Sequence, residues 1–400
     1  MNRYLGQRIG ERDAVISGIG RSQVGRKLGR SGLSLTVESA LRAIEDAGLK
    51  REDIDGLATY PGQIDGSPGM SPCGINDVQD ALRLKLNWFA GGGEVPAQLG
   101  AVFNAVAAVA AGLANHVLVF RTVTESSSQT ATRRASVVGA GSGRIGGSMQ
   151  WMVPFQAVSA SNWVGTYAQR YMHQFGLTRE QLGQIPLNQR RHGALYDEAI
   201  FRDPMTMDDY LAARMISYPL GLFDCDIPCD GSCAVIISRA DAASYLKNVV
   251  RIEAIGSALT GRNSWDQRSD LTETAAHDCA PMMWARTDLK VGDVDTVQLY
   301  DGFSFLTITW LEALGFFPKG EAGPWLEAGE KRIGLGGEIP LNTNGGQLSG
   351  GRLHGYGYLF EACAQLRGEA TGRQVSGAEV AVVAAGGGPL GGCMLLTKNR

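Results

Sequence analysis

The chain has 400 residues, of which 44% are hydrophobic and 19% are charged, so it can bury a large core and is not a disordered protein. Its formal net charge of −3 provides no positive field for nucleic acid or anionic membranes, and we expect neither as a partner. No apolar run reaches the roughly 18 residues that a membrane-spanning helix needs, so we expect no membrane span.

The cysteine and glycine contents indicate the cellular compartment and the positions of tight loops. The seven cysteines are an odd, thinly spread set, and the N-terminal stretch lacks the uninterrupted apolar core of a signal peptide, so we expect a cytoplasmic protein. Glycine occupies 54 positions, near twice its ~7% average share. The glycines form clusters, which predict tight loops where the backbone closely approaches another group: Gly91–Gly93, Gly139–Gly147, Gly345–Gly357 and Gly386–Gly392.

The first segment has an alternating α/β pattern. β-Branched stretches predict strands at Ala14–Ile19 and Ile54–Tyr60, and an amphipathic helix over Thr36–Gly48 lies between them. A glycine-rich turn, a helix and a strand follow over Gly91–Phe120.

The middle of the chain, Thr122–Leu246, differs in character. It opens rich in serine, threonine and glycine, and then shows helical patterns at Ala157–Phe175, Arg179–Arg191 and Met207–Ile216. The stretch Asp224–Ser238 returns to a strand pattern. Insertions of this size inside an α/β fold are usually functional.

The second half repeats the first. Gly48–Tyr60 aligns with Asp288–Tyr300 at a constant offset, and Tyr60 then matches Tyr300. The same order of elements recurs more loosely elsewhere, since Ala14–Gly20 resembles Val250–Gly256 and Gly91–Phe120 resembles Gly345–Ala385. Such a repeat indicates duplication, and two α/β halves bury their surfaces most simply by sharing a central helix layer.

Two motifs that suggest a cofactor are weak. Cys225, Cys229 and Cys233 are spaced unlike structural zinc ligands, which favour closer pairs and a fourth ligand, so we expect buried thiols and no metal. The glycine-rich Gly141–Gly147 is a poor dinucleotide signal because no clear strand leads into it, and a flexible surface loop is the preferred interpretation.

Chemistry-bearing residues gather in the second half. Tyr300–Phe305 ends a predicted strand, which is where ligands collect in α/β proteins. A glycine-rich segment then leads into a helix whose N-terminus offers N–H groups to an anion or oxyanion. Gly386–Gly392 follows the last long strand and would form a third wall. The glycine-rich segment, Asn342–Tyr358, carries Arg352, His354, Tyr356 and Tyr358.

At these positions the chain resembles the thiolase superfamily over almost its whole length. Residues 43–57 (AIEDAGLKREDIDGL) and 188–225 (NQRRHGALYDEAIFRDPMTMDDYLAARMISYPLGLFDC) carry the resemblance, which is closest to the lipid-transfer-protein-like branch with its sterol side-chain aldolases. YDGFS at 300–304 stands where thiolases have Asn-Glu-Ala-Phe. NTNGGQLSGGRLHG at 342–355 stands where they have Asn-x-x-Gly-Gly followed by Gly-His-Pro.

The resemblance implies an architecture. The fold class is α/β, a thiolase-like five-layer αβαβα arrangement with two duplicated halves and a helical loop insertion. The expected units are an N-terminal half (1–121), the insertion (122–222), a return strand of the first half (223–248) and a C-terminal half (249–400).

The departures from the thiolase pattern are chemical. The nucleophilic cysteine of thiolases corresponds to about Pro96 or Ala97, and the segment Glu94–Gly100 contains no Cys, Ser or Thr. The histidine of Gly-His-Pro corresponds to Arg352, and the second thiolase cysteine to about Ala384. An acyl-enzyme mechanism has therefore lost its nucleophile, and arginine is a poor base because it stays protonated.

The resemblance then implies a retro-aldol lyase that acts on a bulky, sterol-like β-hydroxyacyl-CoA and needs no covalent intermediate. The similar aldolases are thought to use a tyrosine matching Tyr300, and a nearby guanidinium such as that of Arg352 would lower its pKa. The expected catalytic residues are Tyr300, Asp301, Arg352, His354 and Tyr356. The expected substrate-binding residues are Asn344, Gly345, Gly346, Gly387 and Gly388.

Partners and alternatives complete the expectations. The CoA thioester is the substrate and no cofactor is needed; a homodimer and a small OB-fold/zinc-ribbon accessory protein are implied by the resemblance. Two alternatives stay open: a non-catalytic acyl-CoA or lipid-binding subunit, and an acetyl-CoA acetyltransferase-like acyltransferase with an atypical site. Glu94 is an acid/base candidate or a solvated loop residue, and Arg190, Arg191 and His192 either meet CoA phosphates or form an exposed helix face.

Overall fold

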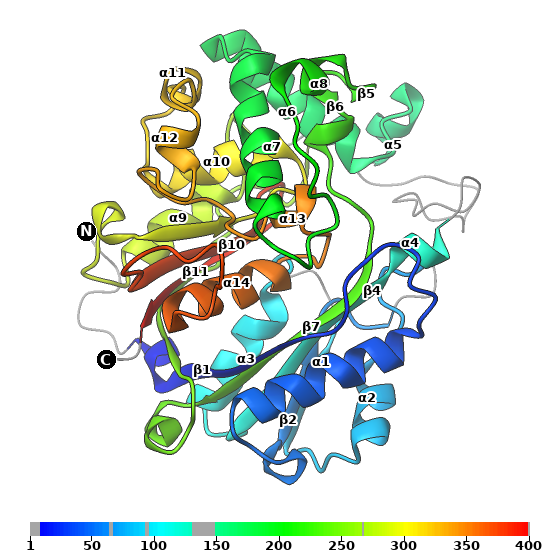
Figure 1. The fold of residues 1–400 in the computed structure, drawn as a ribbon, viewed down its shortest axis with the longest axis vertical. Coiled ribbons are helices and arrows are strands. Elements are labelled where there is room, and N and C mark those ends of the chain that lie inside the picture. The colour runs from blue at the N-terminus through cyan, green and yellow to red at the C-terminus, as the bar shows by residue number, and fades with distance from the viewer. Residues whose placement is uncertain (1–8, 64–66, 93–95, 130–148, 266–267, 399–400) are drawn as a thin grey trace.

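The computed structural model describes residues 9–63, 67–92, 96–129, 149–265 and 268–398. Nine of the described strands form one sheet in the order β3-β2-β4-β7-β1-β8-β11-β10-β9 (Figure 1). The first five are β3 (Trp88–Gly91), β2 (Gly56–Thr59), β4 (His116–Thr124), β7 (Asp230–Arg239) and β1 (Ala14–Arg21). The other four are β8 (Val250–Gly256), β11 (Gly391–Lys398), β10 (Val380–Gly386) and β9 (Thr296–Leu299).

The sheet consists of two halves with a narrow junction. Strands β1 and β8 are antiparallel and pair only at Val15 with Arg251 and at Ile16 with Val250. Beyond this junction the halves fold over each other, so that one face of each half looks onto a shared interior.

Helices divide the molecule into five layers. Helices α3 (Gly100–Ala110) and α14 (Tyr356–Arg367) lie between the two sheet halves and share one apolar core with both (Figure 1). Helices α1 (Gly32–Asp46) and α2 (Ile75–Leu82) cover the outer face of the first half. Helices α9 (Ala276–Trp284) and α10 (Ser304–Leu314) cover the outer face of the second. The expected αβαβα architecture is confirmed.

The duplication is visible in local contacts. In each half the backbone N–H of a lysine donates at 2.7 Å to the side-chain carboxylate of the aspartate three residues later. These pairs are Lys50 with Asp53 and Lys290 with Asp293. The strand that follows, β2 or β9, then pairs in parallel with β4 or β10. Where β3 flanks β2 in the first half, Leu341 forms a parallel bridge beside β9 in the second.

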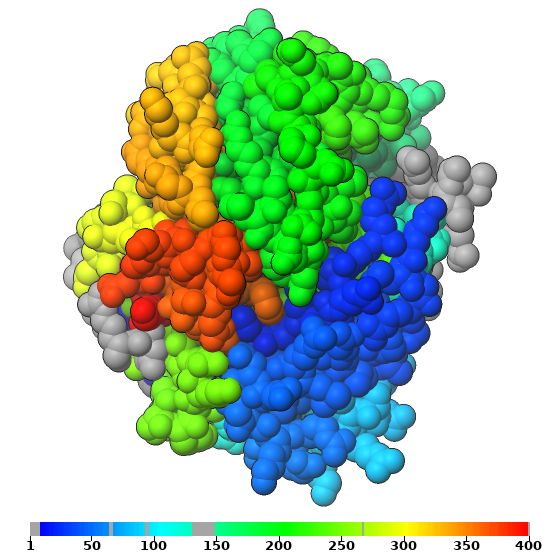
Figure 2. Space-filling model, viewed as in Figure 1, coloured from blue at the N-terminus to red at the C-terminus, as the bar shows by residue number. Residues whose placement is uncertain are grey.

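The middle segment packs mainly on the second half, around α10 (Figure 1). On the face drawn in Figure 2, its green residues meet the orange residues of the C-terminal half and the blue residues of the N-terminal half. Its elements are α4 (Glu125–Ser128), α5 (Met149–Met152), α6 (Ala160–Phe175), α7 (Arg179–Ala194), α8 (Met207–Ala212), β5 (Met215–Ser217) and β6 (Leu220–Gly221).

One predicted helix is too long. Helix α8 ends at Ala212, because Ala213 adopts an extended backbone and Met215–Ser217 pairs with β6 instead. The helical prediction for Met207–Ile216 is therefore wrong in its second half. The glycine loop Gly141–Gly147 lies outside the described residues.

Short elements complete the fold. The remaining α-helices are α11 (Ala322–Leu326), α12 (Glu330–Ile333) and α13 (Gly346–Ser349). The 3-10 helices are η1 (Gly10–Asp13), η2 (Arg51–Asp53), η3 (Val153–Phe155), η4 (Leu222–Asp224), η5 (Ala240–Ser244) and η6 (Val291–Asp293). Within the described ranges, no helix combines the length and apolarity that crossing a membrane requires.

Candidate active site

A cavity of about 500 Å³ opens where the two halves and the middle segment meet. One part of its wall is polar and includes Glu125, Asp226, Tyr300, Arg352 and His354. Another part is apolar and includes Trp163, Val164, Trp265, Phe303, Leu306 and Leu390. A site with a large apolar wall and a few convergent polar groups is typical of small-molecule binding.

Arg352 organises the polar wall by binding two carboxylates. Its Nε and Nη2 each donate to a different oxygen of Glu125 at 2.9 Å, which is a bidentate pair. Its Nη1 donates to Asp226 Oδ1 at 3.0 Å. Glu125 is the first residue of α4, directly after β4, and its side chain is almost fully buried.

The two carboxyl groups differ in acidity. Burial raises the pKa of the Glu125 carboxyl, but the interactions with Arg352, His354 and Arg121 together outweigh burial and lower this pKa to about 2. Burial raises the pKa of the Asp226 carboxyl to about 7, with the charges of Glu125 and Asp301 adding to the shift against Arg352. Glu125 is therefore ionised at neutral pH, whereas Asp226 titrates there.

His354 lines the cavity as a neutral imidazole. Burial and the charge of Arg121 lower its pKa to about 4. Its Nε2 lies 3.5 Å from Glu125 Oε2, and among the described residues Nδ1 has no hydrogen-bond partner. The backbone of His354 is left-handed, with φ of 47°, in the loop that also carries Arg352.

Tyr300 reaches the cavity from the end of β9. Its ring packs edge-on against Tyr358 with the centroids 6.2 Å apart. Asp301 lies behind it and outside the cavity wall: its Oδ1 accepts from the Gln347 N–H at 2.7 Å and from the Tyr358 hydroxyl. Burial raises the pKa of Asp301 to about 6.

Other expected residues lie away from the cavity. Tyr356 is fully buried in the central core, because it opens α14 on the side that faces the sheet halves. Asn344 and Gly346 border a separate enclosed space of about 10 Å³, which is about the size of one water molecule. Gly345 lies against the α7 backbone, where an added Cβ would be 2.9 Å from Gly193 Cα. The structure therefore does not bring these four together with Tyr300.

The last glycine cluster does reach the site. Gly388 lines the cavity beneath Trp265, and an added Cβ would lie only 2.3 Å from that ring. Trp265 in turn contacts Trp163, with ring centroids 5.6 Å apart. Gly387 lies beside the indole nitrogen of Trp310 and donates its N–H to Leu390 O at 2.9 Å.

The position of the thiolase nucleophile is occupied by a methyl group. Ala97 lines the cavity just before α3 and holds a left-handed backbone with φ of 51°. No cysteine belongs to the described cavity wall. Cys73 contacts Thr36, and Cys393 is buried within β11.

Three further cysteines, and the position that matches the second thiolase cysteine, also lie outside the cavity wall. Cys225 donates to Gly221 O at 3.5 Å, while Cys229 and Cys233 are buried. No group of metal-ligating side chains occurs in the part of the chain that the structure describes. Ala384 faces the outer core of the second half, and Glu94 lies outside the described residues.

Helix α7 does not supply a phosphate site to this cavity. Arg190 is buried against the rings of Phe201 and Phe223, and His192 Nδ1 lies 2.9 Å from Leu341 O. The exposed helix face expected for residues 190–192 therefore holds for Arg191 alone, which is partly exposed.

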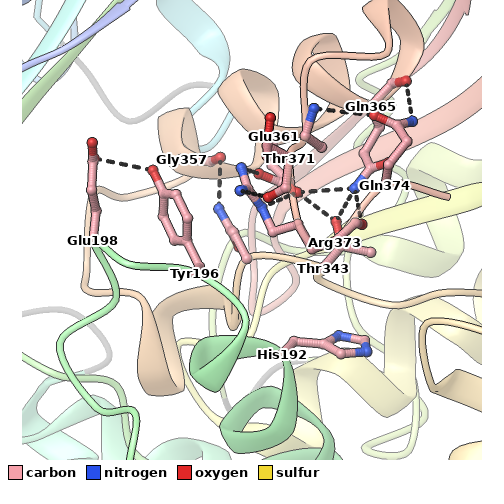
Figure 3. Close-up of polar contacts among 12 residues, drawn as sticks. His192, Tyr196, Glu198, Thr343, Gly357, Glu361, Gln365, Thr371, Arg373 and Gln374 are labelled. Carbon is pink, nitrogen blue, oxygen red and sulfur yellow. Dashed lines mark hydrogen bonds and ion pairs between the residues drawn. The ribbon is translucent and has the colours of Figure 1, made fainter.

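A buried polar network holds the loop that carries Arg352 (Figure 3). Thr343 donates to Glu361 Oε1 at 2.7 Å, and Arg373 pairs with both oxygens of Glu361 at 2.9 and 2.8 Å. The guanidinium of Arg373 also lies over the ring of Tyr196, 4.0 Å from its centroid. The start of the glycine loop, at Thr343, is thereby tied to α14.

Sequence reasoning did not single out Glu125 and Asp226. Glu125 lies in a run of Ser and Thr after a fully buried strand, and Asp226 follows directly on Cys225. These positions lie 227 and 126 residues before Arg352, so no local motif connects them to it.

Comparisons with known proteins agree with this geometry. Residues 257–395 match the family model described as thiolase C-terminal domain-like. A steroid side-chain-cleaving aldolase of Thermomonospora curvata is 32% identical, over 96% of this chain and 97% of the relative. The chain belongs to the thiolase superfamily. A 17-hydroxy-3-oxo-4-pregnene-20-carboxyl-CoA lyase of Mycobacterium tuberculosis is 31% identical, over 96% of this chain and 98% of the relative. Within the superfamily the chain therefore groups with the sterol-carrier-protein-type branch and its aldolases.

Solved structures of the superfamily place the fold. The structure of an Ltp2-ChsH2(DUF35) aldolase superimposes with a TM-score of 0.85 and 30% identity, covering 98% of this chain and all of the other. An acetyl-CoA acetyltransferase from Syntrophomonas wolfei superimposes with a TM-score of 0.69 at 15% identity, which shows the shared fold alone.

Proposed function

We propose that this thiolase-superfamily protein cleaves a carbon–carbon bond in a bulky, steroid-like β-hydroxyacyl-CoA by a retro-aldol reaction. The observation that carries the proposal is the cavity lined by Ala97, which combines polar and apolar lining residues and has no thiol in its described lining. The names of the relatives from Thermomonospora curvata and Mycobacterium tuberculosis support the same reaction class.

The walls suggest a division of roles. The rings of Trp163 and Trp265 suit a flat, apolar ring system. The neutral imidazole of His354 and the phenol of Tyr300 are hydrogen-bond donors for the thioester oxygen, on which negative charge develops when the bond breaks. Gly388 and Ala97 bring backbone close to the same space.

Arg352 acts on more than Tyr300. Its guanidinium interacts electrostatically with Asp226, Glu125 and Tyr300, and it forms ion pairs with the two carboxylates. We assign it the placement of the two carboxylates on the cavity wall. The acyltransferase alternative is not favoured, because that mechanism requires a nucleophile which the described wall does not offer.

Assembly and location are part of the proposal. We propose a homodimer that works with a small OB-fold/zinc-ribbon protein in the cytoplasm. The similar solved aldolase carries a second component in its name, ChsH2(DUF35), which supports the accessory protein. The seven cysteines are all unpaired, which suits a reducing compartment.

The test is a cleavage assay with 17-hydroxy-3-oxo-4-pregnene-20-carboxyl-CoA, with and without the accessory protein. We expect the 17-ketone and propionyl-CoA, detected by liquid chromatography and mass spectrometry. Tyr300→Phe and His354→Ala should lower turnover, whereas Tyr245→Phe, an exposed tyrosine away from the cavity, should not. Equal turnover in all variants refutes the site. Tight acyl-CoA binding without cleavage, accessory protein present, shows a non-catalytic subunit.

A further inference from the structure

Two carboxylates and one guanidinium meet on the cavity wall, and the guanidinium makes more hydrogen bonds to one carboxylate than to the other. Glu125 uses both oxygens in its pair with Arg352 and accepts a further hydrogen bond from Gln129 at 3.1 Å. Asp226 uses only Oδ1 in its contact with Arg352. Among the residues that the structure describes, its Oδ2 has one long contact, 3.5 Å from Gln347 Nε2. Asp226 is therefore the carboxylate with an oxygen to offer to a bound molecule.

The backbone fixes this carboxylate beside Tyr300. The Asp226 N–H donates to Gly302 O at 3.1 Å, and Cys225 and Phe303 form a β-bridge next to it. Asp226 and Tyr300 both line the same cavity. Backbone contacts thus hold the segment that carries this carboxyl group beside the strand end where the site begins.

We propose that Asp226 is the general base of the cleavage, accepting the proton of the substrate's β-hydroxyl, while Glu125 remains the permanent counter-ion of Arg352. The inference rests on the retro-aldol function proposed above and adds the residue that moves the proton.

The step balances without an external oxidant or reductant. Asp226 takes the hydroxyl proton, and the O–H electron pair becomes the new C=O bond. The bond between the α and β carbons breaks, and its pair passes to the thioester as an enolate. The proton on Asp226 then returns to the α carbon, which yields a ketone and a shortened acyl-CoA and restores the carboxylate.

Charge around Asp226 suits this role. The pKa of about 7 follows from burial, lowered by Arg352 and raised by Glu125 and Asp301, so both forms of the carboxyl are populated near neutral pH. The titratable and charged groups near it are Arg352, Glu125, Asp301, Cys225, Tyr300 and His354. Because a base acts when deprotonated, turnover should rise with pH through about 7.

The first test is the pH–rate profile of Asp226→Asn with the steroid CoA substrate named above. Loss of a general base lowers kcat by about 10²- to 10⁴-fold, and the rise of activity through neutral pH should disappear. Asp226→Glu should restore part of kcat because it restores a carboxylate. Asp197→Asn, at a fully exposed aspartate, is the control that keeps native kcat and profile.

A second variant separates a base from a structural residue. Glu125→Gln removes a negative charge that raises the pKa of Asp226, so the rise of activity should move to lower pH. Binding of propionyl-CoA, measured by calorimetry, shows whether each variant keeps its folded site. Should Asp226→Asn fail to fold, Asp226→Ala takes its place, and an unchanged kcat and profile there counts against the base.

The outcomes distinguish the two proposals. Native cleavage together with native kcat and profile in the Asp226 variant overturns Asp226 as the base and leaves the retro-aldol function standing. Absence of cleavage by the native protein with its accessory partner overturns the function, and the base with it. Native cleavage with loss of the pH dependence in Asp226→Asn supports both.

Discussion

Gly302 shapes the site through the side chain that it lacks. A Cβ at this position would lie 2.4 Å from Tyr300 Cε1 and 2.8 Å from both Cζ and the hydroxyl oxygen, whereas ordinary contacts begin at 3.4 Å. In Gly302→Ala the phenol must therefore move by about 1 Å, a misplacement that typically costs about 10²-fold in rate. That factor corresponds to roughly 2.7 kcal/mol of activation free energy.

The assay is steady-state cleavage of the same steroid CoA substrate, with acyl-CoA binding measured alongside. Gly292→Ala is the matched control, because no atom lies within 4 Å of the Cβ added there. We expect kcat to fall in Gly302→Ala alone, while both variants keep their circular dichroism spectrum. Equal kcat in the two variants would refute the reasoning, since it would mean that the position of Tyr300 does not matter to the chemistry.

Three further predictions follow from other parts of the fold. Arg373→Met leaves the buried Glu361 carboxylate without its ion-pair partner and should lower the free energy of unfolding by about 3–5 kcal/mol in urea titrations. Arg202→Met, at an exposed ion pair, is the control and should change it little. Equal free energies of unfolding in the two variants would contradict a stabilising role of the buried pair. Trp265→Ala removes an aromatic pair and should weaken binding of a steroid acyl-CoA by about 2- to 10-fold, while binding of acetyl-CoA stays unchanged. Equal losses of affinity for both ligands would argue against a wall that binds the steroid rings. Ala97→Cys places a thiol before the N-terminus of α3, so mass spectrometry should detect an acyl adduct with acetyl-CoA that the native protein lacks; no adduct would show that the cavity does not present the thioester to this position.

Much of the fold follows from local sequence patterns. The alternating strands and helices of each half, and the repeat that places Tyr300 where Tyr60 stands, are properties of short segments and survive as β2 and β9 with the same lysine–aspartate contact. The end of α8 was mispredicted because its helical pattern continues into residues that pair with β6 instead. Pairing with a neighbouring strand is a tertiary effect that a helical period does not reveal.

The expected site residues also fall into two groups, those that line the cavity and those that do not. Tyr300, Arg352, His354 and Gly388 lie at strand ends or in a glycine loop, and this local position predicts them near one site, where all four line the cavity. The absence of a thiol near Ala97 follows from the resemblance to thiolases. Asn344, Gly345, Gly346, Asp301 and Tyr356 share those motifs, yet they point into loop contacts or the central core.

The charge balance of the site depends on the folded chain. Glu125 and Asp226 reach Arg352 from segments far away in the chain, and its guanidinium pairs with both carboxylates as well as interacting with Tyr300. Burial and Coulomb interactions depend on distances in space, so the sequence alone determined which side chains are present, and folding determined which of them hold a proton.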